Sequence, residues 1–82
     1  MQVEVKVPEM EGIESVTVTY WHCKEGDEVS EGADLVEAAT EKATFNISSP
    51  VSGVLLKKNF QEGDYVETGG IIAVIKKGEV KK

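Results

Sequence analysis

Residues 35–48 read LVEAATEKATFNIS, and their pattern predicts a tight β-hairpin. Reversing the chain at Glu41 and Lys42 as a two-residue loop sets apolar residues opposite one another on one side and polar residues on the other. The facing pairs are Thr40/Ala43, Ala39/Thr44, Ala38/Phe45, Glu37/Asn46 and Val36/Ile47. A slip of one residue would mix the two sides, because side chains alternate with a period of two along a strand. The pattern therefore fixes the register and puts Lys42 at the tip.

Glu41-Lys42 is an unusual pair for such a loop. Two-residue hairpin loops favour Asn-Gly and other glycine-containing pairs, because their central residues need positive φ. A type I turn suits Glu-Lys better. A turn that runs against propensity suggests a function at the tip, although a lysine in a surface turn can also be an ordinary solvated residue. An exposed amine can form an amide with a carboxylic cofactor delivered as an activated ester, which needs access for a modifying enzyme and no pocket.

Two segments flanking the hairpin repeat each other at an offset of 37 residues: 24–36 read KEGDEVSEGADLV and 61–73 read QEGDYVETGGIIA. Each copy predicts a strand, a Gly-Asp turn, a very short strand, a Gly turn and a strand. Glycine supplies positive φ in such turns, and we expect the aspartate to bond the backbone two residues on. The repeat predicts a pseudo-twofold structure in which the C-terminal strand pairs with the N-terminal strand. Both termini should then lie at the end opposite Lys42.

The rest of the chain also predicts short strands and shows no helical period. The apolar residues alternate or cluster at Val3, Val5 and Val7, at Val16, Val18 and Tyr20, over 54–56 and over 71–75. Close turn signals favour an all-β flattened barrel or sandwich over residues 1–77, followed by a linker stub or tail at 78–82. Trp21 is either a core anchor or a surface contact, and burial is the preferred interpretation.

Size and charge exclude several classes of protein. Eighty-two residues allow one domain, and no apolar run is long enough to cross a membrane. The net charge is −6, and all nine cationic residues are lysines, so nucleic acid is not an expected partner. Residues 1–41 hold eleven acidic residues and two lysines (−9), whereas 42–82 hold four and seven (+3). The preferred reading of the acidic half is a solvated surface; the alternative is a docking surface for basic enzymes.

Cys23 and His22 are the chain's single cysteine and single histidine. They exclude an intrachain disulfide and argue against a closed zinc site. Neighbours on a strand point to opposite faces, so the two are poorly placed as a nucleophile and its base, and we expect structural roles for both. With no other acid, base or nucleophile constellation in view, the chain is not expected to be an enzyme by itself.

Over nearly its whole length the chain resembles the lipoyl domains of 2-oxo acid dehydrogenase acyltransferases. Residues 40–43, TEKA, look like the lipoylation motif, and the other matches are 7–8, Trp21 with 24–29, 35–37, 49–53 and 62–66. The resemblance implies a flattened eight-stranded barrel with lipoate on Lys42, and with Thr40, Glu41 and Ala43 as the recognition turn. The arm would carry acyl groups and reducing equivalents between active sites.

The implied partners are a lipoate ligase or lipoyl transferase, a 2-oxo acid decarboxylase and dihydrolipoamide dehydrogenase, with no membrane or nucleic acid. The implied location is the cytoplasm, or the mitochondrial matrix in a eukaryote. The alternative is a biotinyl carrier domain of a biotin-dependent carboxylase or decarboxylase, which resembles this fold but usually has methionines on both sides of its lysine. In this chain the residues on both sides of Lys42 are Glu41 and Ala43. A non-carrier module of the same fold is disfavoured because such modules usually lose the lysine, and the related glycine-cleavage carrier is normally longer and carries an added helix. Departures from the lipoyl pattern include Glu41 for Asp, Ala39 for Glu and a short loop at 9–13.

Overall fold

A computed structural model describes residues 1–78 of the chain. The described residues form eight strands and no helix. They therefore include no helix that could cross a membrane. The strands are β1 (Gln2–Lys6), β2 (Ser15–Trp21), β3 (Glu28–Val29), β4 (Asp34–Ala39), β5 (Thr44–Ser48), β6 (Gly53–Lys58), β7 (Tyr65–Glu67) and β8 (Ile71–Lys77). The predicted all-β fold with eight strands is confirmed. All but the first residue of the predicted tail at 78–82 lies outside the described residues.

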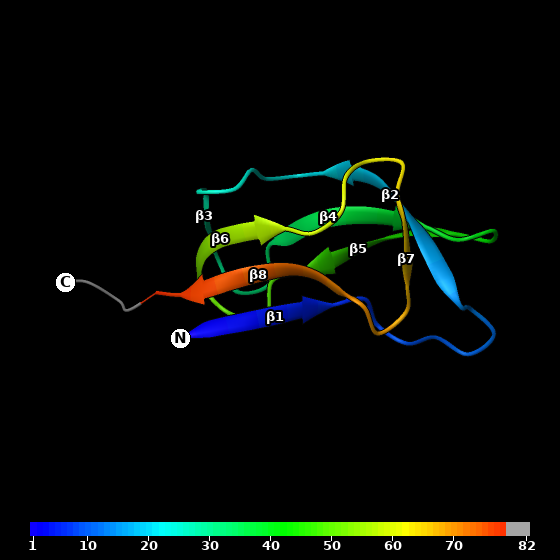
Figure 1. The fold of residues 1–82 in the computed structure, drawn as a ribbon, viewed down its shortest axis with the longest axis horizontal. Helices are drawn as coiled ribbons and strands as arrows, with labels where there is room; N and C mark the ends of the chain where they lie inside the picture. Colours follow the sequence, from blue (N-terminus) through cyan, green and yellow to red (C-terminus); the bar gives the residue numbers. More distant parts are fainter. Residues whose placement is uncertain (79–82) are drawn as a thin grey trace.

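The strands form two antiparallel four-stranded sheets. The first sheet has the order β1-β8-β6-β3 and the second the order β5-β4-β2-β7. β1 pairs with β8 from Gln2↔Lys76 onward, as the repeat predicts. The N-terminus and the C-terminal end of β8 lie at one end of the flattened molecule, and the turn between β4 and β5 projects at the other (Figure 1). For the described residues, the predicted placement of the two end strands opposite the Lys42 turn is therefore confirmed.

The two copies of the repeat adopt matching backbone conformations. Gly26 and Gly63 both have φ of 96°, a value that side chains other than glycine rarely adopt. The amide of Gly26 donates to the carbonyl of Leu55 and the amide of Gly63 donates to that of Val18, both at 2.7 Å. Each Gly-Asp turn thus bonds a strand of the other half of the chain, so the pseudo-twofold relation holds in the structure as well as in the sequence.

The aspartates of the repeat differ from our expectation. The Oδ2 atom of Asp27 accepts from the amide of Lys24, and that of Asp64 accepts from the amide of Gln61, both at 2.8 Å. The bonded amide thus lies three residues before the aspartate and not two residues after it. The intervening turn brings the earlier amide next to the carboxylate, because Asp27 N also donates to Lys24 O and closes the turn.

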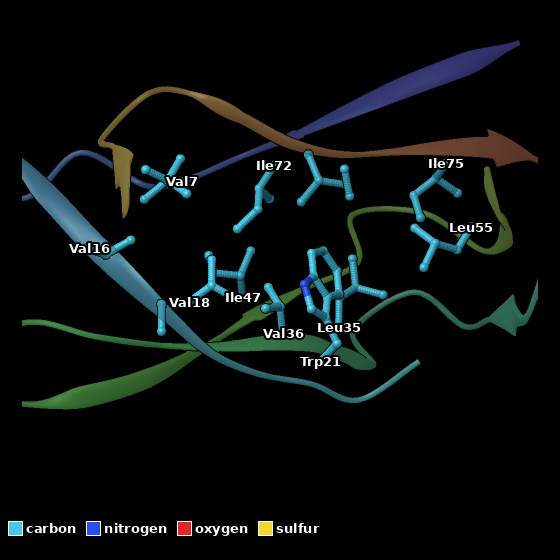
Figure 2. Packing of buried hydrophobic residues seen from close by; sticks show 14 residues of the cluster. Val7, Val16, Val18, Trp21, Leu35, Val36, Ile47, Leu55, Ile72 and Ile75 are labelled. Atoms are coloured by element: carbon cyan, nitrogen blue, oxygen red, sulfur yellow. The ribbon is translucent and has the colours of Figure 1, made fainter. Parts of the chain in front are cut away.

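A single hydrophobic core fills the space between the sheets (Figure 2). The side chains that point inward from the alternating strands of both sheets make up this core. The buried members are Val5, Val7, Val16, Val18, Trp21, Leu35, Val36, Ala38, Ile47, Leu55, Val66, Ile72, Ala73 and Ile75. The core extends to the base of the β4–β5 hairpin and so provides a rigid support for its turn.

A β-bulge in β2 changes which aromatic residue is buried. Val18 pairs with Ala38 and Tyr20 pairs with Glu37, so Thr19 is an extra residue in β2. The bulge reverses the alternation after Val18. Tyr20, which the sequence places in line with Val18, is instead 55% exposed, and Trp21 is only 7% exposed. The preferred burial of Trp21 is confirmed, and its indole Nε1 donates to the carbonyl of Phe60 at 3.0 Å.

Candidate functional site

The β4–β5 hairpin has the register that the sequence predicts. Its strand pairs are Val36↔Ile47, Glu37↔Asn46, Ala38↔Phe45 and Ala39↔Thr44. Apolar Ala38 and Ile47 face the core, whereas Asn46 faces solvent. The ladder shifts only at its far end, between Asp34 and Val36. The four pairs hold the two strands as far as the turn, so the turn is fixed in position by the packed part of the molecule.

Thr40 closes the turn with its backbone and its hydroxyl group. Its amide donates to the carbonyl of Ala43 at 2.8 Å. Its Oγ1 accepts from the amides of Lys42 and Ala43 and donates to the carbonyl of Ala43, each at 3.2 Å. Among residues 1–78 only glycines have positive φ, which excludes the primed turns and fits the expected preference of Glu41-Lys42. The resemblance implied that Thr40 belongs to the recognition turn, but the sequence did not indicate these hydrogen bonds.

Lys42 stands at the tip with an exposed side chain. Glu41 and Ala43 on either side are exposed as well, and Thr40 is half-buried. The structure therefore brings the four predicted site residues together in one turn, with the amine projecting and the threonine beneath it. A primary amine so placed is open to an acylating enzyme from most directions. Its chemistry fits a cofactor that is attached through an amide.

The hollows in the surface of the described residues lie elsewhere. One, of about 550 Å³, is lined by Trp21, Glu25, Lys58, Phe60, Gln61 and Glu62. Neither it nor the two other hollows that we find is lined by any residue of the 40–43 turn. These three hollows therefore give Lys42 no pocket, which agrees with the expectation that attachment needs access for a modifying enzyme and not a pocket.

The first hollow contains contacts that the sequence did not assign. The Oε2 atom of Glu25 accepts from the amide of Lys58 at 2.8 Å, and that of Glu62 accepts from the amide of Trp21 at 3.1 Å. These two glutamates are equivalent in the repeat, and so are Lys58 and Trp21. The Nζ of Lys58 lies 5.0 Å from the centre of the Trp21 ring, within the range of a cation–π contact. The four residues tie the two halves together, which is a structural role.

His22 and Cys23 each have a partner of their own. The Nε2 atom of His22 lies 2.8 Å from Oδ1 of Asn46, on the exposed side of the second sheet. Cys23 is half-buried, and its Sγ lies 3.9 Å from the carbonyl oxygen of Leu35. Burial and the nearby negative charge of Asp27 raise the pKa of the Cys23 thiol, against a smaller lowering by Lys58. A raised pKa makes the thiol a poor nucleophile.

Sequence comparison relates the chain to proteins with known functions. The profile of the biotin/lipoyl family, described as biotin-requiring enzyme, matches residues 3–75. The chain is 40% identical over 76 residues to the dihydrolipoyllysine-residue acetyltransferase component of the pyruvate dehydrogenase complex of Corynebacterium glutamicum, covering 92% of the chain and 11% of that protein. It is 42% identical over 76 residues to the succinyltransferase component of the 2-oxoglutarate dehydrogenase complex of Staphylococcus saprophyticus, covering 92% and 18%. The chain thus spans less than a fifth of either relative.

Structure comparison finds solved proteins with the same fold, among them a lipoyl domain and a carboxylase. The lipoyl domain of the 2-oxoglutarate dehydrogenase complex from Azotobacter vinelandii matches with a TM-score of 0.73 and 26% identity, over 92% of the chain and 99% of that domain. Urea carboxylase from Kluyveromyces lactis matches with a TM-score of 0.81 and 21% identity, over 93% of the chain and 6% of that enzyme. The second likeness concerns the fold alone.

Proposed function

The chain belongs to the biotin/lipoyl family, and from that membership we propose that it is a lipoyl carrier domain whose Lys42 is amide-linked to lipoic acid. The observation that carries the proposal is an exposed lysine at the tip of a hairpin whose turn Thr40 closes. Two relatives at about 40% identity support it, because their names specify a dihydrolipoyl group on a lysine residue. Glu41 and Ala43 complete the turn that an attaching enzyme would read.

The chain's residues do two things in this function. Thr40 holds the backbone of Lys42 through the hydroxyl bond to its amide, so the starting point of the arm is fixed. The side chain of Lys42 is exposed, so its methylene stem is free to swing. During attachment Nζ attacks the acyl carbon of an activated lipoate; the amide bond forms, the activating group leaves with the bonding electrons, and the amine loses a proton. When bound, the lipoyl disulfide supplies an acceptor for an acyl group and for two electrons.

The proposal extends to a larger assembly. Both curated relatives are acyltransferase components of 2-oxo acid dehydrogenase complexes. We therefore infer that the domain is itself non-catalytic and carries acyl groups from a 2-oxo acid decarboxylase to an acyltransferase, and reducing equivalents to dihydrolipoamide dehydrogenase. A lipoate ligase or lipoyl transferase would load it in the cytoplasm, or in the mitochondrial matrix of a eukaryote. The position of the Lys42 turn opposite the N-terminus and the end of β8 supports this, because a tether at either end would leave the arm pointing outward.

Intact-mass measurement tests the attachment. The chain is incubated with a lipoate ligase, lipoate and ATP, and in parallel with a biotin ligase, biotin and ATP. We expect a gain of one lipoyl group, located by peptide mapping at Lys42, and no gain with biotin. The matched control is Lys24→Ala, which removes another loop lysine and should leave labelling intact, whereas Lys42→Ala should abolish it. A wild-type chain that stays unlabelled by lipoate, or labelling that survives Lys42→Ala, would refute the proposal.

A further inference from the structure

The two sheets differ in charge. In the strands of the first sheet lysines outnumber glutamates: Lys6, Lys57, Lys58, Lys76 and Lys77 against Glu4 and Glu28. The strands of the second sheet contain no lysine and three acidic residues, Asp34, Glu37 and Glu67. Because β4 and β5 belong to the second sheet, the Lys42 hairpin projects from the acidic one. Asp34 lies at the far end of the hairpin, so Glu37 and Glu67 are the strand residues that give this sheet its negative charge on the side of Lys42.

Two tyrosines stand exposed on this acidic sheet. Tyr20 on β2 is 55% exposed and Tyr65 on β7 is 76% exposed. Tyr65 pairs with Thr17 of β2, so the two tyrosines lie on neighbouring strands. The other large hydrophobic residues that are exposed in the described part of the chain, Met1 and Leu56, lie outside this sheet. Single exposed tyrosines are common, but two on neighbouring strands of one sheet offer a partner the type of side chain that is enriched among the residues that dominate affinity.

Side-chain contacts order this surface. His22 contacts Asn46 through the 2.8 Å bond, and its ring meets the Tyr20 ring edge-on, with centroids 5.2 Å apart and planes at 75°. Thr19 donates from Oγ1 to Oε2 of Glu37 at 2.9 Å. Side chains that are already ordered lose little conformational entropy when a partner covers them. We call the surface of Tyr20, Tyr65, His22, Asn46 and Glu37 the tyrosine face.

We propose that the tyrosine face docks the enzyme that attaches lipoate to Lys42, an inference that rests on the proposed function. That enzyme must present its activated lipoate, an acyl adenylate, to the amine. Phosphate groups are bound by arginine and lysine side chains, so we expect basic residues around the adenylate site of that enzyme. A basic entrance to that site attracts the acidic sheet and repels the lysine-bearing one. Tyrosine rings add favourable contact with arginine or lysine side chains.

The attachment step has a defined balance. Nζ of Lys42 attacks the acyl carbon of the adenylate, and the C–N bond forms as the bond from the acyl carbon to the phosphate oxygen breaks. AMP leaves with the electron pair, and the amine proton passes to solvent or to a base of the enzyme. The tyrosine face takes no part in these bonds; it holds the hairpin at the entrance, so its loss should raise KM and leave kcat nearly unchanged.

Lipoylation kinetics test the proposal. With a bacterial lipoate ligase, lipoate and ATP, kcat/KM is measured for the wild-type chain, Tyr20→Ser and Tyr65→Ser. We expect each substitution to lower kcat/KM by about fivefold or more through KM. The matched control is Leu56→Ser, which removes an exposed apolar side chain from the first sheet and should leave kcat/KM unchanged. Thermal unfolding of each variant checks that the fold is kept, as expected for exposed positions.

A charge-matched pair separates the face from overall charge. Glu37→Gln with Glu67→Gln, on the second sheet, should lower kcat/KM at low salt and flatten its dependence on ionic strength. Glu4→Gln with Glu28→Gln changes the net charge by the same amount on the first sheet and should do neither. Equal effects of the two pairs, or tyrosine variants that react like wild type, would overturn the docking proposal while leaving the carrier function intact. A wild-type chain that takes no lipoate at all would overturn the carrier function instead.

Discussion

At the scale of single residues, Thr40 is the side chain that shapes the site. Replacing it by valine keeps the size and removes Oγ1, which accepts from the amides of Lys42 and Ala43. We expect Thr40→Val to lower the free energy of unfolding by about 1 kcal/mol. This is the usual net contribution of one intramolecular hydrogen bond, which replaces hydrogen bonds to water in the unfolded chain. Lipoylation should slow severalfold, because the turn samples other conformations. Chemical denaturation and mass-based labelling rates measure the two effects.

Thr44→Val is the matched control for that substitution. Thr44 is an exposed threonine in the same hairpin, and it is paired with Ala39 through the backbone. Valine is well tolerated in a strand, so stability and labelling should stay close to those of the wild type. If Thr40→Val and Thr44→Val behave alike, the hydroxyl of Thr40 has no special part in the turn.

Cys23 offers a second prediction at this scale. Its pKa is raised by burial first and by the charge of Asp27 second, so the reactive thiolate forms at higher pH in the folded chain than in the unfolded one. The rate of alkylation by iodoacetamide, followed against pH, should have a higher midpoint in buffer than in concentrated urea. Asp27→Asn should lower the folded midpoint, since it removes a charge and keeps an oxygen for the amide of Lys24. Coincident midpoints for folded and unfolded chains would contradict the assignment.

At the scale of strands, the sequence predicted the hairpin fully and β2 only in part. The hairpin was predictable because a period of two allows one register that separates Ala38 and Phe45 from Glu37 and Asn46. The bulge at Thr19 was not, because no residue type marks it and its cause lies in the pairing of β2 with β4. This one extra residue exposes Tyr20, so the tyrosine face could not be foreseen from the alternation of the chain.

The equivalence of the two Gly-Asp turns leads to a prediction about elements. Gly26 and Gly63 have the same φ of 96°, and a Cβ built at either meets nothing within 4 Å. Alanine at these positions therefore costs backbone strain without a clash, roughly 1–2 kcal/mol for a residue held in a left-handed conformation. We expect Gly26→Ala and Gly63→Ala to lower the denaturation midpoint by equal amounts. A clear difference between them would show that the two halves are not equivalent in energy.

Gly53→Ala serves as the contrasting variant for that pair. A Cβ there would overlap the carbonyl oxygen of Lys76, on the neighbouring strand β8. Backbone must move to relieve such an approach, so this variant should lose more stability than either turn variant. If Gly53→Ala proves the mildest of the three, the argument from local conformation fails.

At the scale of the whole molecule, the sequence showed an uneven charge but not its place in space. Residues 1–41 are acidic, yet they supply β1 and β3 to the first sheet and β2 and β4 to the second. The exchange of strands between the halves redistributes the charge, so that each sheet mixes early and late segments. Only the pairing of strands reveals that the acidic sheet is the one that bears Lys42, and pairing depends on contacts far apart in the sequence.

The shared core predicts that both sheets unfold together. Ile75 on β8 of the first sheet and Ile47 on β5 of the second are buried in the same cluster, at 0% and 5% exposure. Shortening either to valine should cost about 0.5–1.5 kcal/mol. Fluorescence of Trp21 reports on β2 in the second sheet, and far-ultraviolet circular dichroism reports on all strands. Because one core joins the sheets, Ile75→Val should shift both signals to the same lower denaturant midpoint, as Ile47→Val does. An Ile75→Val chain whose Trp21 transition stays at the wild-type midpoint would mean that the second sheet, and with it the Lys42 hairpin, is stable without the first.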